Sequence, residues 1–174
     1  DGGAMFGVVP KSLWERTNPA DSKNLIELGT RSLLVEDGKK LILIDCGLGN
    51  KQDEKFFGHY SLYGDESLDK NLKKYGFVRE DITDVFLTHL HFDHCGGAIE
   101  WNDDKTGYRP AFKNAQFWTN ENHWQWATEP NPREKASFLK ENILPIPDFR
   151  KLFQQQISGC IFRFRHKILR QEVL

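Results

Sequence analysis

The chain has little of what would mark a disulfide scaffold or a membrane protein. Only three of its 174 residues are cysteines (Cys46, Cys95 and Cys160), and no two of them form a Cys-x-x-Cys pair. A sparse and odd number of cysteines argues against a disulfide framework and favours a reducing compartment, so we expect a cytoplasmic location. No apolar run approaches the roughly 20 residues that span a membrane, and we expect no membrane partner.

A strong net charge is also missing. The formal net charge is −1, so the whole chain offers no electrostatic attraction for nucleic acid, and a small-molecule substrate is favoured. The charge is uneven, however. Residues 150–174 hold six Lys and Arg residues against one acid, Glu172, a net charge of +5 that leaves −6 for the rest. We interpret residues 1–147 as one domain and residues 148–174 as a basic tail, in which only a helix at the end is expected.

What the chain does contain is an alternation of short strands and helices. Apolar runs at 32–36 and 40–44 flank Asp37-Gly38, a hairpin signal. Residues 48–66 are predicted to be a loop, 67–75 a helix that stops at Gly76, and 82–88 and 115–119 strands. Asn120 is expected to cap a short helix to residue 126, with His123 on its surface. Asn131-Pro132 is expected to begin a helix that runs to Asn142.

The most specific feature is the segment 88–97, Thr-His-Leu-His-Phe-Asp-His-Cys-Gly-Gly. Four potential metal ligands, His89, His91, Asp93 and His94, follow directly on a short apolar run. Side chains at i and i+2 of an extended backbone point the same way, so His89 and His91 can hold one ion. Asp93 and His94 lie on the turn beyond and can face a second. Imidazole nitrogens and a carboxylate suit zinc and its borderline neighbours.

This motif resembles the His-x-His-x-Asp-His signature of the metallo-β-lactamase superfamily. Two upstream segments extend the resemblance over about residues 1–145. Residues 41–47, Leu-Ile-Leu-Ile-Asp-Cys-Gly, are similar to the family's strand that ends in Asp-x-Gly. Residues 1–10 are similar to its lactonase and organophosphate-hydrolase branch. The resemblance implies an α+β fold, an αββα sandwich, of which this chain would supply mainly the N-terminal half.

The resemblance also implies a function. It implies a metal-dependent hydrolase that uses two zinc ions to activate water against an ester, a lactone or a similar small molecule. In that reading His89, His91, Asp93 and His94 bind metal, and Asp93 also takes part in catalysis by accepting a hydrogen bond from the attacking water. Asp45 braces the metal loop from behind. A phosphodiesterase or nuclease of the same family is the alternative, and a flavin-linked di-iron oxidoreductase a weaker one, because those relatives carry Glu at the position of His91.

One departure from the family pattern keeps a non-catalytic reading open. Members supply a later His, a metal-bridging Asp and a final His, whereas this chain has only His123 and His166 after His94, and neither matches a family motif. We therefore expect a fragment or a truncated form, which as a pseudoenzyme would not be catalytic. An uncovered sheet face further predicts a homo-oligomer.

Overall fold

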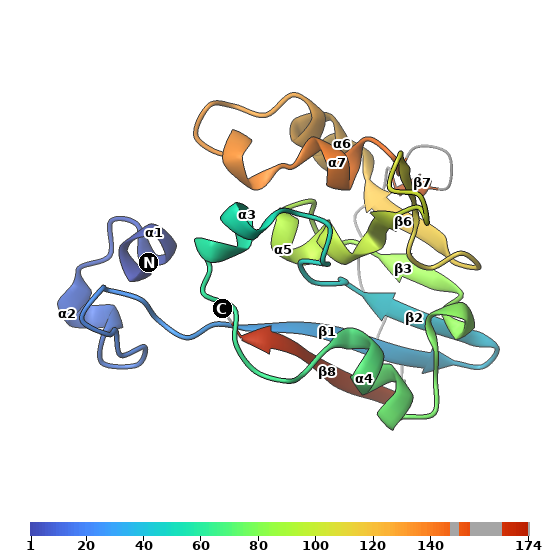
Figure 1. Cartoon of the computed structure of the whole chain (residues 1–174), viewed down its shortest axis with the longest axis horizontal. Helices are drawn as coiled ribbons and strands as arrows, with labels where there is room; N and C mark the ends of the chain where they lie inside the picture. Colours follow the sequence, from blue (N-terminus) through green and yellow to red (C-terminus); the bar gives the residue numbers. More distant parts are fainter. Residues whose placement is uncertain (147–149, 154–164, 174) are drawn as a thin grey trace.

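The computed structural model describes residues 1–146, 150–153 and 165–173. Its centre is a six-stranded mixed sheet with the strand order β7-β6-β3-β2-β1-β8 (Figure 1). Strand β1 is antiparallel to both β2 and β8, whereas β2, β3, β6 and β7 run parallel to one another. The strands span β1 Gly29–Asp37, β2 Lys40–Ile44, β3 Asp84–Phe86, β6 Gln116–Asn120, β7 Arg150–Phe153 and β8 Arg165–Val173.

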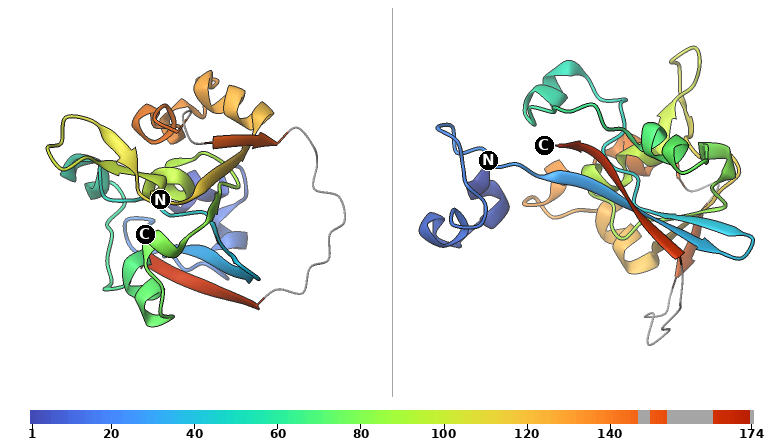
Figure 2. Two further views of the ribbon diagram at one scale, coloured as in Figure 1. Left: turned by 90° about the vertical axis from the view of Figure 1, so that its right-hand side faces the viewer. Right: turned by 90° about the horizontal axis from the view of Figure 1, so that it is seen from below.

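Short helices and a small second sheet surround this centre. Helix α4 lies against β8, while α7 contacts both α5 and α6 near the ends of the parallel strands (Figure 1). Figure 2 shows α1 and α2 set apart from the sheet. The helices are α1 Gly2–Phe6, α2 Lys11–Trp14, α3 Glu54–Gly58, α4 Leu68–Lys74, α5 Phe92–Cys95, α6 Glu121–Thr128 and α7 Lys140–Ile143, with 3₁₀ turns η1 Arg79–Asp81, η2 Gly96–Ala98 and η3 Lys135–Ser137. The second sheet pairs β4 Ile99–Trp101 with β5 Tyr108–Pro110.

Local sequence signals account for many of these elements. The predicted hairpin forms as β1 and β2, and Gly38 takes the positive φ of 60° that its turn requires. The Ser67 hydroxyl accepts from the Lys70 amide at 3.2 Å, which begins α4, and the helix ends before Gly76. Asn120 accepts from the His123 amide at 3.2 Å and caps α6, as expected. The segment 48–66 was expected to be only loop, but it also contains α3.

The helix predicted over residues 131–142 does not form as one element. Asn131 does accept from the amides of Arg133 and Glu134, at 2.9 and 3.2 Å. The turn then ends, because Phe138 and Leu139 adopt extended conformations with ψ of 92° and 122°. This break buries the Phe138 ring to 5% exposure, so a tertiary contact overrides the local helix signal.

The helix expected at the end of the chain is also wrong, because residues 165–173 form β8. This strand pairs along β1 (Figure 2), and it covers backbone groups of β1 that would otherwise form a sheet edge. Strand β7 pairs with β6. Both strands beyond residue 147 thus belong to the sheet of the earlier ones, while the rest of the basic tail lies outside the described residues.

The core is apolar and lies between the sheet and the helices around it. Leu43, Val85 and Leu72 are fully buried there. Cys46 and Cys95 are buried and unbridged, as expected from their spacing. No helix within the described ranges is both long and apolar enough to cross a bilayer.

Candidate metal centre

The histidine-rich loop lies where three parallel strands end. Asp45 follows β2, Thr88 and His89 follow β3, and His123 lies on α6 directly after β6. Because β2, β3 and β6 are parallel and adjacent, their carboxyl ends meet at one edge of the sheet. This edge is where open α/β sheets generally place their functional groups.

Backbone contacts hold the loop in place. The amides of His94 and Cys95 both donate to the His91 carbonyl at 3.0 Å, which starts α5. The Cys46 amide donates to the His94 carbonyl at 2.8 Å, and the Gly97 amide to Gly47 at 2.9 Å. A Cβ on Gly96 would overlap the Leu48 carbonyl. The loop after β2 and the turn after α5 therefore touch backbone to backbone, which only glycine permits.

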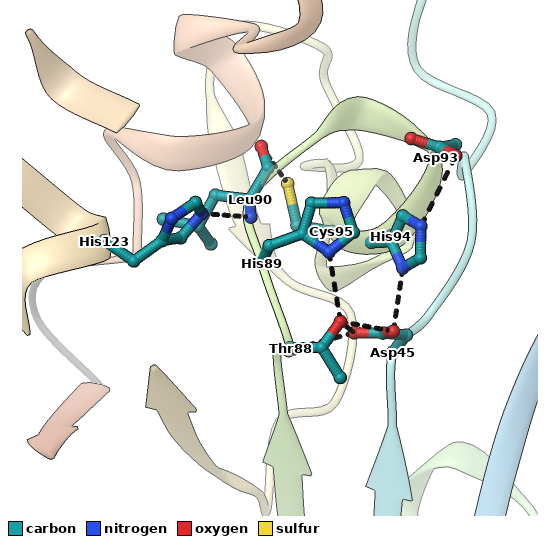
Figure 3. Close-up of polar contacts among 8 residues, drawn as sticks. All are labelled: Asp45, Thr88, His89, Leu90, Asp93, His94, Cys95 and His123. Atoms are coloured by element: carbon teal, nitrogen blue, oxygen red, sulfur yellow. Dashed lines mark hydrogen bonds and ion pairs between the residues drawn. The ribbon is translucent and has the colours of Figure 1, made fainter. Parts of the chain in front are cut away.

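Asp45 is the hub of the polar network. It has φ of 56°, a left-handed conformation that Asp tolerates better than most residues, and its side chain is only 11% exposed. It accepts from the Thr88 amide at 2.9 Å and from the Thr88 hydroxyl at 2.7 Å (Figure 3). His94 Nδ1 lies 2.8 Å from the same carboxylate. Asp45 therefore ties Thr88 and His94 together, and the role that the resemblance implies for it stays a prediction.

This carboxylate also sets the tautomers of two imidazoles. His94 donates its Nδ1 proton to Asp45, and in a neutral ring this leaves Nε2 unprotonated. The Thr88 hydroxyl donates its one proton to Asp45, so toward His89 Nδ1, 3.1 Å away, it can act only as an acceptor. Nδ1 of His89 therefore carries the proton, and Nε2 of this ring is unprotonated. These proton positions are assigned from the hydrogen-bond network. Nε2 of His89 thus has a lone pair available to a cation, and Nε2 of His94 has one whenever its ring is neutral.

Electrostatics distinguish the two rings. Burial lowers the pKa of His89 to about 4, helped by the neighbouring His94 and His91, so this ring is neutral at pH 7. Burial would also lower the pKa of His94, but the hydrogen bond that His94 donates to Asp45 and the charges of Asp93 and Asp45 outweigh it, and the pKa is raised. The raised pKa favours a second proton on Nε2, which faces Asp93, and a cation at this atom would compete with that proton.

The structure brings the predicted ligands close together. The ring centroids of His89 and His94 are 3.9 Å apart and those of His89 and His91 4.7 Å. Asp93 lies on the outer side of His94, with its Oδ2 3.5 Å from His94 Nε2 (Figure 3). Within the described ranges, however, no three His, Cys, Asp or Glu groups stand in a finished metal-binding arrangement. The imidazole and carboxylate donors are of the types that fit a divalent ion, and the ligand set stays a prediction.

His123 has a different place from the one expected. Instead of lying on an exposed helix surface, its ring is partly buried, and Nε2 accepts from the Leu90 amide at 2.9 Å (Figure 3). Burial lowers its pKa, and the nearby His91 lowers it further. The signal that could have revealed this is its position one turn after a strand parallel to β3. Thr88 and Lys51, whose ammonium group donates to the Gly96 carbonyl, were missed as well.

An aromatic wall adjoins the loop. The Phe138 ring packs against His91 at 4.7 Å and His123 at 5.8 Å between centroids. Phe138 also lines a cavity of about 520 Å³, together with Leu139, Ile143 and the side chains of Lys135 and Lys140. The histidine loop is therefore bordered on this side by apolar surface with basic groups.

A histidine-rich loop at the carboxyl ends of the parallel strands of a mixed sheet defines a class of metal-binding α/β domain. Residues 25–150 match the family model described as "Metallo-beta-lactamase superfamily". The chain belongs to this superfamily, and the fold expectation, a part of the metallo-β-lactamase sandwich, is confirmed.

Solved structures that resemble the chain include proteins described as hydrolases. A "probable metal-dependent hydrolase" from Staphylococcus aureus is 31% identical with a TM-score of 0.81, over 92% of this chain and 57% of that one. AidC, described as a dizinc quorum-quenching lactonase, is 27% identical with a TM-score of 0.50, over 73% of this chain and 44% of that one.

A curated relative matches a shorter stretch. The transcription termination factor FttA of Methanocaldococcus jannaschii is 33% identical over 70 residues, 40% of this chain and 9% of that protein. The chain thus spans little more than half the length of the Staphylococcus aureus hydrolase and a small part of FttA.

Proposed function

We propose that this chain carries the metal-binding loop of a hydrolase that opens a lactone or ester bond in a small molecule, with two zinc ions as the metal. The observation that carries the proposal is the network around Asp45. One buried carboxylate holds Nδ1 of His94 directly and Nδ1 of His89 through Thr88, so the Nε2 atom of each ring is left for another partner and can bind a cation when it is unprotonated.

Each residue of the motif then has a role. His89 and His91 hold one metal ion, and Asp93 and His94 the other, with Asp45 fixing the orientation of His94. A bound divalent ion supplies a water whose pKa falls from about 15.7 toward about 7 and polarises the substrate carbonyl. Asp93 is one-third exposed, so its carboxylate can accept a hydrogen bond from the attacking water and orient it.

A lactone or ester is favoured over a phosphodiester for two reasons. AidC, which the chain resembles over 73% of its length, is described as a lactonase. The chain also has a net charge of only −1, without the excess of basic residues expected for a polyanionic substrate. The apolar wall at Phe138 and the cavity that it lines can accommodate the hydrocarbon part of such a substrate.

The test compares wild-type protein with H91A, and with H59A as the matched control because His59 is an exposed histidine outside the motif. Zinc content is measured together with hydrolysis of N-hexanoyl-homoserine lactone, p-nitrophenyl acetate and bis(p-nitrophenyl) phosphate. We expect H91A to lose both zinc and lactone turnover while H59A keeps both. Faster turnover of the phosphodiester would favour the phosphodiesterase alternative. Wild-type protein that binds zinc without hydrolysing any substrate would favour a pseudoenzyme.

A further inference from the structure

The backbone amide of Leu90, which lies between the predicted ligands His89 and His91, donates to a side chain and not to a neighbouring strand. Beyond β3 the Leu87 amide still donates to the Trp118 carbonyl of β6 at 2.9 Å. The Thr88 amide then donates to Asp45, and the Leu90 amide to Nε2 of His123 at 2.9 Å. Leu90 is fully buried, so water cannot replace His123 as the acceptor, and an unpaired amide there would be costly.

His123 is itself held rigidly. Its amide is fixed by the Asn120 cap, which places it in the first turn of α6. Its ring packs against Trp126 at 5.7 Å and Phe138 at 5.8 Å between centroids, and these two rings also contact each other. An imidazole that accepts at Nε2 carries its proton on Nδ1. The ring therefore presents a fixed lone pair to one backbone N–H.

We propose that His123 is a positioning residue of the metal centre, which fixes the Leu90 peptide and through it the directions of His89 and His91. The inference rests on the metal site proposed above. His89 and His91 are separated only by Leu90, so a rotation of its peptide would turn the two imidazoles away from each other. Their present separation, 4.7 Å between centroids, depends on this peptide. Groups that orient metal ligands typically contribute about 10- to 100-fold to metal affinity.

The experiment uses two substitutions of His123. H123L removes the acceptor, whereas H123Q places an amide oxygen near the position of Nε2. H59L is the control, since His59 is exposed. In metal-free protein, hydrogen exchange of the Leu90 amide is followed by NMR. We expect this exchange to become roughly tenfold faster in H123L, because the hydrogen bond is lost, and to return toward the wild-type rate in H123Q.

Zinc affinity is measured by chelator competition, and the geometry by the visible spectrum of the cobalt-substituted protein. We expect zinc binding about 10- to 100-fold weaker in H123L, with an altered cobalt spectrum, and within about threefold of wild type in H123Q. If H123L does not fold, H123N replaces it, because the Asn side chain is too short to bring an acceptor to the Leu90 amide.

The two proposals fail in different ways. Wild-type protein that holds no zinc would contradict the proposed function. Zinc affinity and a cobalt spectrum that are unchanged in H123L would overturn the role of His123 while leaving the metal site intact. Exchange of the Leu90 amide that is equally slow in wild type and H123L would overturn it regardless of zinc.

Discussion

Replacing Asp45 by Asn should change the protonation of His94, and the structure gives the reason. The Oδ1 atom can stay a carbonyl oxygen that accepts from the Thr88 amide, now 2.9 Å away. The new NH₂ group then faces His94 Nδ1, where Asp45 Oδ2 lies at 2.8 Å. Two donors cannot share this position, so His94 must move its proton to Nε2. The flipped amide is excluded, because it would face the backbone N–H of Thr88, which can only donate.

The magnitude follows from the bonds that are lost. Hydrogen bonds to a charged group contribute about 1.5–3 kcal/mol each, and Asn at this position loses the charge while keeping the shape and the left-handed backbone. We expect D45N to lower the free energy of unfolding by about 2 kcal/mol. D45A, which leaves Thr88 and His94 without the acceptor, should lose about 3–5 kcal/mol. Protonation of His94 Nε2 should weaken zinc binding by about 10- to 100-fold in D45N.

Three measurements decide this prediction. Urea unfolding gives the stability of both variants, chelator competition gives the zinc affinity, and ¹⁵N NMR of the imidazoles gives the tautomer of His94. The reasoning is refuted if D45N keeps the proton on Nδ1 of His94 and binds zinc within twofold of wild type. A loss of stability alone would mean that Asp45 is structural only.

Three further predictions concern the scaffold, each measured by urea unfolding. G96A should lower the free energy of unfolding by about 3 kcal/mol or more, because the new Cβ overlaps the Leu48 carbonyl. G38A, at a residue with φ of 60° and open space around it, should lower it by only about 1 kcal/mol. Equal losses in the two variants would contradict this. Burial lowers the pKa of Lys51 to about 8, so between about pH 8 and 10.4 the unfolded chain binds more protons than the folded one. The free energy of unfolding of wild type should therefore rise by about 2–3 kcal/mol relative to that of K51M as the pH rises through this window. A difference between the two proteins that does not change with pH would refute this. F138A should lose about 3–5 kcal/mol by enlarging the cavity beside the loop, and a loss below about 1 kcal/mol would contradict the packing described here.

Sequence reasoning succeeded where the cause is local. The hairpin depends on Asp37-Gly38, α4 on the Ser67 cap and on Gly76, and the start of α6 on Asn120. Each signal acts within a few residues of the element that it sets. The histidine motif is local as well, and its three imidazoles do gather in the fold.

It failed where distant segments decide the structure. The helix signal at Asn131 is overridden because Phe138 packs on His91 and His123. The end of the chain forms β8 because it pairs with the backbone of β1, a segment more than 100 residues earlier in the chain. His123 appears in the sequence as one residue of a Trp-rich helix, and only the parallel pairing of β3 with β6 brings it to Leu90.

The central claim is that His89, His91, Asp93 and His94 bind the metal that the reaction needs. The most direct measurement is a crystal structure of the zinc-loaded protein. We expect one zinc ion on His89 and His91 and a second on Asp93 and His94, with Zn–N distances near 2.0–2.1 Å and Asp45 still bonded to Nδ1 of His94. Zinc bound elsewhere, or a motif that stays without metal at saturating zinc, would contradict the account.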